Sequence, residues 1–323
     1  MLVKESLSRD VLRLIVWYPL RWLIKAIPVK QGLAVFRTMG DIHSGLSENK
    51  RNVVIRNLKT VLGDKLSDHE LSGIAANYFR NHYVNQLQIF LFPKLNRNNL
   101  EKIHRFKGLE NLDQALKKGN GCILLHPHFG PAQLPLCALG ILGYPVIQLG
   151  LPTDEGLSFV GRKVAFRLRM KYEGKIPAKI IMATSFLRPV MECLQNNGVL
   201  MMTGDGAGGG KFVGKFIPVK FLGKNVLFPL GAATLAQKKG APLLPMFTIM
   251  KETGGYETII HKPINLASNG QDINPVEANT AKFARLMEDY VYKYPYLWHF
   301  WDEMENRLLS SQPKGEITLN EIL

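Results

Sequence analysis

Short apolar runs alternate with longer amphipathic segments between residues 106 and 263 of this 323-residue chain. Such runs, bounded by glycine or proline, are typical of buried strands. They predict strands at Gly121–Leu125, Pro145–Leu149, Val199–Thr203, Pro242–Ile249 and Tyr256–His261. The segments between them predict helices at Pro131–Leu142, Gly156–Met170, Thr184–Asn196 and Leu230–Lys239. This alternation indicates an α/β fold whose mainly parallel sheet is covered by helices on both faces.

The residues before this region have helical patterns. Apolar residues recur at helical spacing from Asn49 to Leu62, with basic residues on the opposite face. A capping box, Ser67-Asp68-His69-Glu70, predicts the start of a second helix that runs to about Phe90. After the α/β region, Asn274-Pro275-Val276-Glu277 predicts the start of a last helix, which runs to about Tyr292.

The first forty residues are apolar but interrupted by charges, so no run reaches the roughly 20 residues that a membrane-spanning helix needs. They also lack the cleavage site of a signal peptide. Trp17, Tyr18 and Trp22 lie among Arg21 and Lys25, a mixture that is typical of a membrane interface. We therefore predict membrane attachment here, with an amphipathic helix packed on the protein's own core as the alternative.

Four regions follow from these patterns. Residues 1–40 are the expected membrane-attachment segment, 41–105 a helical lead-in, 106–305 the α/β core and 306–323 a tail. Basic residues outnumber acidic ones by 41 to 26, an excess that suits a polyanionic partner. Three cysteines in apolar surroundings, without metal-ligand spacing, predict reduced core residues.

The first candidate for chemistry is His128, in the segment Leu125-His126-Pro127-His128-Phe129-Gly130-Pro131. It is expected at the turn between a strand and a helix whose first residue is Pro131. Open α/β sheets place ligands at this edge, and a histidine there can act as a general base. Gln133, five residues later, could reach back and orient the ring. The alternative is a pair of core histidines bonded to backbone.

The second candidate is the glycine-rich stretch Gly204–Lys211, which follows a predicted strand. It is not a P-loop, because Asp205 stands where that motif has its first glycine and Phe212 where it has serine or threonine. Its backbone can still approach an anion closely. Lysines and phenylalanines then alternate from Lys211 through Lys215 to Lys224, which predicts a pair of short strands with one basic face, with turns at Gly214 and Gly223.

The block that begins at His128 resembles the HX4(D/E) motif of the lysophospholipid acyltransferase superfamily, and most closely its bacterial lipid A late acyltransferase branch. Gln133 replaces the acid of that motif. Asp205-Gly206 resembles the family's acceptor-binding block, and Gly240–Phe247 resembles its final glycine-alanine-proline block. Tyr296–Trp301 resembles its aromatic ending without the arginine, and we expect this cluster in the core or at an interface.

This resemblance implies a membrane-associated acyltransferase on the cytoplasmic face of the inner membrane. The donor would be an acyl thioester of acyl carrier protein or coenzyme A, and the acceptor a hydroxyl or amine of a lipid or glycolipid. His128 would be the general base, oriented by Gln133, while Asp205, Gly206, Lys211 and Lys215 would bind substrate. No metal, cofactor or nucleic acid is expected.

Three alternatives remain open from the sequence. Asp205, followed by Asp154 or Glu155, could supply the acid that position 133 lacks. A lipid- or carrier-binding protein without turnover would account for Gln133 directly. A nucleic-acid-binding protein would account for the net charge of +15, but no nucleic-acid motif is present.

Overall fold

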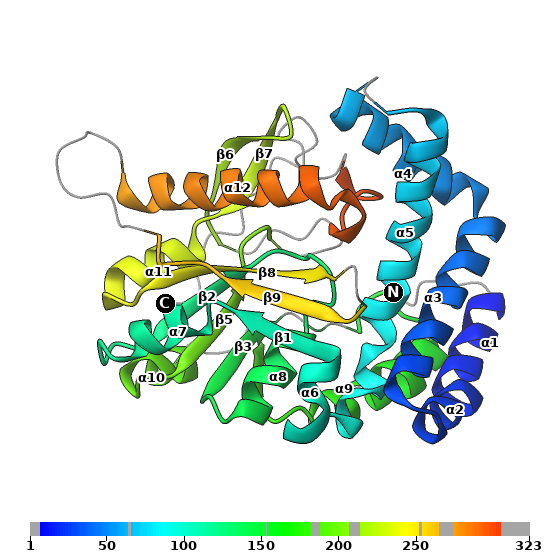
Figure 1. The fold of residues 1–323 in the computed structure, drawn as a ribbon, viewed down its shortest axis with the longest axis horizontal. Coiled ribbons are helices and arrows are strands. Elements are labelled where there is room, and N and C mark those ends of the chain that lie inside the picture. Colours follow the sequence, from blue (N-terminus) through cyan, green and yellow to red (C-terminus); the bar gives the residue numbers. More distant parts are fainter. Residues whose placement is uncertain are drawn as a thin grey trace.

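The computed structural model describes residues 7–63, 66–150, 152, 154–182, 188–206, 214–251, 254–264 and 274–304. A seven-stranded sheet lies at its centre, in the order β1-β9-β8-β2-β5-β3-β4 (Figure 1). These strands are β1 His104–Lys107, β2 Cys122–His126, β3 Val146–Gly150, β4 Lys179–Met182, β5 Val199–Thr203, β8 Leu243–Met250 and β9 Tyr256–Ile260. All five predicted strands are present, each within one residue of its expected bounds.

Five neighbouring strands of the sheet, from β8 to β4, are parallel. Strand β9 runs antiparallel to β8, and β1 pairs with β9 in parallel. The prediction of a mainly parallel sheet covered by helices is therefore confirmed. The strands that the sequence did not indicate, β1 and β4, are four-residue edge strands in which exposed residues interrupt the apolar pattern.

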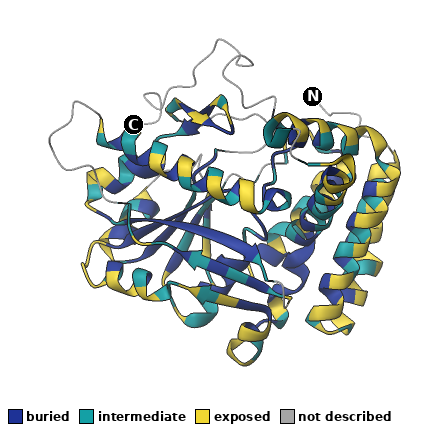
Figure 2. Ribbon diagram, turned by 45° about the horizontal axis from the view of Figure 1, so that its top comes forward, coloured by how far each residue is buried: buried dark blue, intermediate teal, exposed yellow. Residues whose placement is uncertain are grey.

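Both faces of the sheet carry a hydrophobic core, as the alternating side chains of β2 show. Ile123 and Leu125 join the core on the side of α10, α11 and α12, whereas Cys122 and Leu124 join the core on the side of α7 and α8. These helices span Leu109–Leu116 (α7), Leu134–Leu142 (α8), Arg188–Gln195 (α10), Gly231–Lys239 (α11) and Pro275–Lys293 (α12). The sheet is accordingly the most buried part of the chain (Figure 2). The three cysteines are buried and free.

The described residues between Leu7 and Leu87 form helices that pack beside one end of the sheet (Figure 1). They are α1 Leu7–Ile15, the π-helical segment η1 Val16–Leu20, α2 Arg21–Ala26, α3 Val29–Leu46, α4 Glu48–Leu62 and α5 Asp68–Leu87. The predicted capping box is confirmed, since the Ser67 hydroxyl accepts from the Glu70 N–H and the Glu70 carboxylate accepts from the Ser67 N–H. Across the described residues, none of these or the later helices is both long and apolar enough to cross a bilayer.

The remaining elements are short and lie between the helices and strands described above. They are η3 Gln88–Phe90, η4 Phe92–Lys94, α6 Arg97–Ile103, the π-helical segment η5 Gly161–Phe166, α9 Arg167–Glu173 and η6 Pro295–Leu297. The predicted helix 156–170 is thus displaced toward the carboxyl end, as η5 and α9. Residues 184–187 of the predicted helix 184–196 lie outside the described residues, and the rest of it is α10. The lysine-rich segment forms the predicted pair of short strands, β6 Phe216–Phe221 and β7 Lys224–Pro229, which run antiparallel. Gly214 and Gly223 take left-handed backbone conformations beside these strands.

Candidate active site

The register of two neighbouring strands brings His128 and Asp205 together. Strands β2 and β5 are parallel, and His126 at the end of one pairs with Thr203 at the end of the other. The Gly204 N–H donates to the His126 carbonyl at 2.8 Å, which extends the ladder by one step. His128 and Asp205 each lie two residues beyond that pair, so they leave the sheet at the same level of its carboxyl edge.

The Asp205 carboxylate holds His128 with both oxygens. Oδ1 accepts from the ring Nδ1–H at 2.8 Å, and Oδ2 accepts from the His128 backbone N–H at 3.0 Å. Because a carboxylate only accepts, Nδ1 carries the proton of the neutral ring and Nε2 is left with a lone pair. The Asp205 side chain is 2% exposed and that of His128 is 27% exposed. The arrangement can remove a proton from a molecule at Nε2, with a buried charge ready to stabilise the imidazolium.

The carboxyl-terminal segment fixes the turn that carries His128. The Gly130 N–H donates to the Leu297 carbonyl at 2.8 Å, and the His299 N–H donates to the His128 carbonyl at 3.0 Å. The His299 ring donates from Nε2 to the Gly130 carbonyl at 2.7 Å. The ring of Phe300 lies 4.7 Å from that of His128, centroid to centroid. The aromatic cluster from Leu297 to Trp301 is largely buried, and it supports the turn from this side.

The neighbouring histidines differ from His128 in their chemistry. Burial lowers the pKa of His126 to about 4, and burial together with the nearby His128 lowers the pKa of His299 to about 3. Both rings are therefore neutral near pH 7. His126 is buried within the sheet and its Nδ1 lies 3.1 Å from the Pro127 carbonyl, whereas His299 is held by Gly130, so His128 is the histidine of this group that presents a ring nitrogen for chemistry.

Gly130 is required by the backbone of this turn. Its φ is +59°, and a Cβ at this position would lie 2.5 Å from the Thr248 carbonyl oxygen. We expect Gly130→Ala to lower the free energy of unfolding by about 2–4 kcal/mol, because a left-handed conformation and a backbone clash are combined. Thermal unfolding followed by circular dichroism measures this.

Gly223→Ala is the matched control. Gly223 has a φ of +73°, but no atom lies within 4 Å of the position that a Cβ would take there. Gly223→Ala should therefore lower the free energy of unfolding by only about 1 kcal/mol, which is the cost of the left-handed conformation alone. Equal losses from the two substitutions would show that the contact with Thr248 is not what makes Gly130 necessary.

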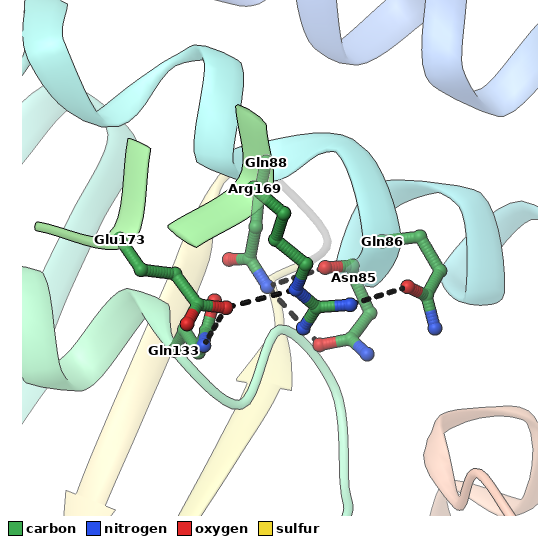
Figure 3. A network of polar contacts seen from close by, with 6 residues as sticks. All are labelled: Asn85, Gln86, Gln88, Gln133, Arg169 and Glu173. Atoms are coloured by element: carbon green, nitrogen blue, oxygen red, sulfur yellow. Dashed lines mark hydrogen bonds and ion pairs between the residues drawn. The ribbon is translucent and has the colours of Figure 1, made fainter. Parts of the chain in front are cut away.

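Gln133 does not contact the ring of His128, so the predicted hydrogen bond between them is wrong. Its amide Nε2 donates instead to Oε1 of Glu173 at 3.2 Å (Figure 3). The physical reason is that Pro131 does not begin the helix as predicted: residues 131–133 form a turn and α8 begins at Leu134. This extra turn directs the Gln133 side chain toward α9, while Asp205, the first of the alternative acids, takes the place beside the ring.

The other residues that the sequence predicts for the site are Gly206, Lys211 and Lys215, with Asp154 and Glu155 as alternative acids. Gly206 follows Asp205 with a φ of +82°. Lys211 lies outside the described residues, whereas Lys215 is exposed just before β6. Asp154 lies 4.0 Å from Arg162 in an exposed ion pair. Among the side chains that the structure describes, no cluster of three or more metal-ligating groups is present.

Several residues at this site were not indicated as functional by the sequence. Asn85 and Glu173 both contact the turn after His128, and Arg169 connects the two helices that carry them (Figure 3). A signal was available for Glu173, since it is the only acidic residue between Arg162 and Lys179. On a helix, an acid four residues after an arginine lies beside it and can pair with it, as Glu173 does with Arg169.

The family model of bacterial lipid A biosynthesis acyltransferases matches residues 5–304, which include the strand, the turn and the supporting carboxyl-terminal segment. The chain belongs to this family. A search of curated proteins finds no match. Membership makes the chain an acyltransferase of lipid A biosynthesis, and it implies an acyl donor and a lipid acceptor as substrates.

Proposed function

We propose that this acyltransferase moves a fatty acyl group from acyl carrier protein to a hydroxyl group of a lipid A precursor or a related glycolipid, with His128 as the general base. The observation that supports this best is the pair formed by His128 and Asp205. It combines a partly exposed ring with a buried carboxylate at 2.8 Å from Nδ1. A base that is oriented and charge-stabilised in this way suits the deprotonation of an alcohol.

In the proposed reaction, Nε2 of His128 takes the proton of the acceptor hydroxyl as its oxygen attacks the thioester carbonyl carbon. The tetrahedral intermediate then collapses, and the carbon–sulfur bond breaks. The departing thiolate receives the proton from the imidazolium, so an ester and a free thiol are formed and the ring returns to its neutral state. Asp205 remains ionised throughout and stabilises the imidazolium while it exists.

The donor is proposed from charge. The chain carries a net charge of +15, and acyl carrier protein is acidic, so the two attract each other at long range. Lys215 is exposed just before β6, so it is free to meet an anionic group of the donor or acceptor. The role proposed for Lys211 and Lys215 is binding of such a group, and coenzyme A is the alternative donor.

The experiment is a transfer assay with purified protein, acyl carrier protein thioester and a lipid extract. Mass spectrometry should detect a lipid that has gained one acyl group, and a thiol reagent should detect one free thiol for each ester formed. A parallel assay with acyl coenzyme A separates the two donors. Hydrolysis of the thioester without any acylated lipid would contradict the proposal.

Membrane attachment through the amino-terminal helices is also part of the proposal. Leu7, Val11, Ile15, Tyr18 and Trp22 recur at helical spacing and are all exposed. In the same segment, Trp17 and Ile24 are buried in the core. One face of the segment is thus packed on the protein, as the alternative interpretation expects, and another apolar face is exposed, which supports the proposed attachment. Apolar and aromatic residues on such a face can enter the bilayer interface.

Cations lie beside this apolar face. Lys25 Nζ lies 4.6 Å and the Arg21 guanidinium carbon 5.0 Å from the ring centre of Trp22. Aromatic rings with adjacent cations suit the headgroup region of an anionic membrane. We place the protein on the cytoplasmic face of the inner membrane, where a cytoplasmic carrier and a membrane acceptor can meet.

The triple substitution Val11→Ser, Ile15→Ser and Trp22→Ser should weaken binding to anionic vesicles by about 100-fold, because each removes roughly 1 kcal/mol of apolar burial. Cosedimentation with vesicles measures this. Removal of residues 1–40 would be a poorer test, since it would also expose the core that Trp17, Ile24 and Phe36 help to form.

The control is a triple substitution of exposed apolar residues elsewhere: Ile42→Ser, Leu46→Ser and Tyr292→Ser. It removes similar surface and should leave vesicle binding within about threefold of wild type. If the two triple variants lose the same affinity, the attachment surface is not the face of α1, η1 and α2.

A further inference from the structure

We infer that Glu173 is a positioning residue for His128 and acts on it through Gln133. This inference rests on the proposed role of His128 as the base. Glu173 is the last residue of α9, and its carboxylate Oε1 accepts from two donors, the Arg169 Nε at 2.8 Å and the Gln133 Nε2 at 3.2 Å. One carboxylate oxygen therefore joins α9 to the turn that leads from His128 into α8 (Figure 3).

A second pair in the chain shows what is special about Glu173. Arg188 and Glu192 on α10 have the same four-residue spacing and the same Nε–Oε1 distance of 2.8 Å. Their side chains are 75% and 50% exposed, so that pair is an ordinary surface contact. The Glu173 side chain is only 7% exposed. A buried carboxylate is costly unless its partners are well placed, and its added partner here is Gln133.

The turn from residue 127 to residue 133 is held at both of its ends. At the His128 end, Asp205 and the carboxyl-terminal segment hold the ring and the backbone. At the α8 end, the Asn85 Oδ1 accepts from the Ala132 N–H at 3.1 Å, and Glu173 accepts from Gln133. Loss of either contact would loosen the α8 end of the turn.

These two contacts belong to one closed arrangement. Arg169 donates from Nε to Glu173. Its Nη1 donates at 3.4 Å to Oε1 of Gln86, the neighbour of Asn85 on α5. The Gln88 Nε2 donates to Asn85 Oδ1 at 3.1 Å and so fixes the oxygen that receives Ala132. Helix α5, helix α9 and the turn are thereby tied to one another (Figure 3). A displacement of about 1 Å at a catalytic group can cost 100-fold in rate, so such a tie matters to turnover.

The same geometry explains why position 133 carries an amide. Gln133 donates to Glu173, which a carboxylate could not do. A glutamate at position 133 would place two carboxylates at hydrogen-bond distance, where they repel each other. Gln133 and Glu173 therefore act as a matched donor and acceptor, and the pair should tolerate an exchange of roles better than either single change.

The test compares wild type with Gln133→Glu, Glu173→Gln, the exchanged pair Gln133→Glu/Glu173→Gln, and Glu192→Gln as control. We expect Gln133→Glu to lower kcat about 10- to 100-fold with little change in KM, because it displaces the base without removing substrate contacts. Glu173→Gln should be milder, since its amide oxygen can still accept from Gln133. The exchanged pair should recover to within about threefold of wild type, which would demonstrate coupling, and Glu192→Gln should match wild type.

A second readout does not depend on acyl transfer. Peptide mass spectrometry can measure the rate at which diethyl pyrocarbonate carbethoxylates His128. This rate should differ from that of wild type in Gln133→Glu and return to the wild-type value in the exchanged pair. If wild type transfers acyl groups but the two single effects simply add in the exchanged pair, Glu173 does not position His128. If wild type transfers no acyl groups, the proposed function fails. Equal rates of His128 labelling in wild type, both single variants and the exchanged pair would overturn this inference, whatever the transfer assay shows.

Discussion

Asp205→Asn should lower kcat by about 1,000- to 10,000-fold, the size of the effect when the acid of a hydrolase triad is replaced by its amide. The geometry of this carboxylate shows why. Its Oδ2 accepts from the His128 backbone N–H and its Oδ1 from the ring Nδ1. An asparagine has one oxygen, and the backbone N–H can only donate, so that oxygen should stay on the backbone. The amide NH2 then faces Nδ1.

That orientation forces the wrong tautomer on His128. Nδ1 must become the acceptor, so the proton moves to Nε2 and the lone pair that would receive the acceptor's proton is lost. The negative charge that stabilises the imidazolium is lost as well. Steady-state kinetics measures the fall in kcat, and nitrogen NMR of the ring distinguishes the tautomers. A matched control is Asp113→Asn, an exposed residue whose carboxylate accepts from the Tyr144 hydroxyl. Activity of Asp205→Asn within tenfold of wild type would show that Asp205 is not the functional partner of the ring.

The strands and the location of the site were predictable because they depend on local patterns. The apolar run that ends at Leu125 and the run that ends at Thr203 each indicate a buried strand, and both strands are present. The polar residues that follow such strands gather at one edge of a parallel sheet. The sequence therefore indicated which side of the fold carries His128 and Asp205 before any contact between them was known.

The sequence left the partner of His128 open between Gln133 and the acids Asp205, Asp154 and Glu155, because the choice depends on strand order and on where one helix begins. Strands β2 and β5 are neighbours in space although β3 and β4 lie between them in sequence. Only this adjacency makes Asp205 the partner of His128. The prediction for Gln133 assumed a helix from Pro131, and the later start of α8 at Leu134 turns that side chain toward Glu173.

The role of the carboxyl-terminal residues that support the site was not predictable for a different reason. His299 and Phe300 were expected in the core or at an interface, and Phe300 is buried. Their effect on the site arises because the chain returns to the first turn about 170 residues later, as the bond from His299 Nε2 to the Gly130 carbonyl shows. Contacts between residues so distant in sequence leave no periodic pattern. The segment is thus both part of the core and a support of the site, because the same packed aromatic residues hold the turn that carries His128.

His128→Ala should abolish acyl transfer, with a loss of at least about 10,000-fold, because the base is removed and no neighbouring histidine can replace it. His126 and His299 are both held by backbone carbonyls, and their pKa values are lowered to about 4 and about 3, so neither is placed to accept the proton. The protein should remain folded. The backbone N–H at position 128 still donates to Asp205, and the ring was partly exposed.

Kinetics on the folded variant and an added small base test this prediction together. His128→Ala leaves a gap between Phe300 and the Asp205 carboxylate, and that carboxylate has lost one of its two donors from residue 128. Free imidazole can fill the gap and donate to Oδ1, and it should restore part of the transfer in a concentration-dependent way. His69→Ala, at an exposed position in the first turn of α5, is the matched histidine control and should retain full activity. Wild-type turnover by a folded His128→Ala protein would exclude His128 as the base, whereas loss of turnover with rescue by imidazole and not by sodium chloride would identify the missing group as the imidazole ring itself.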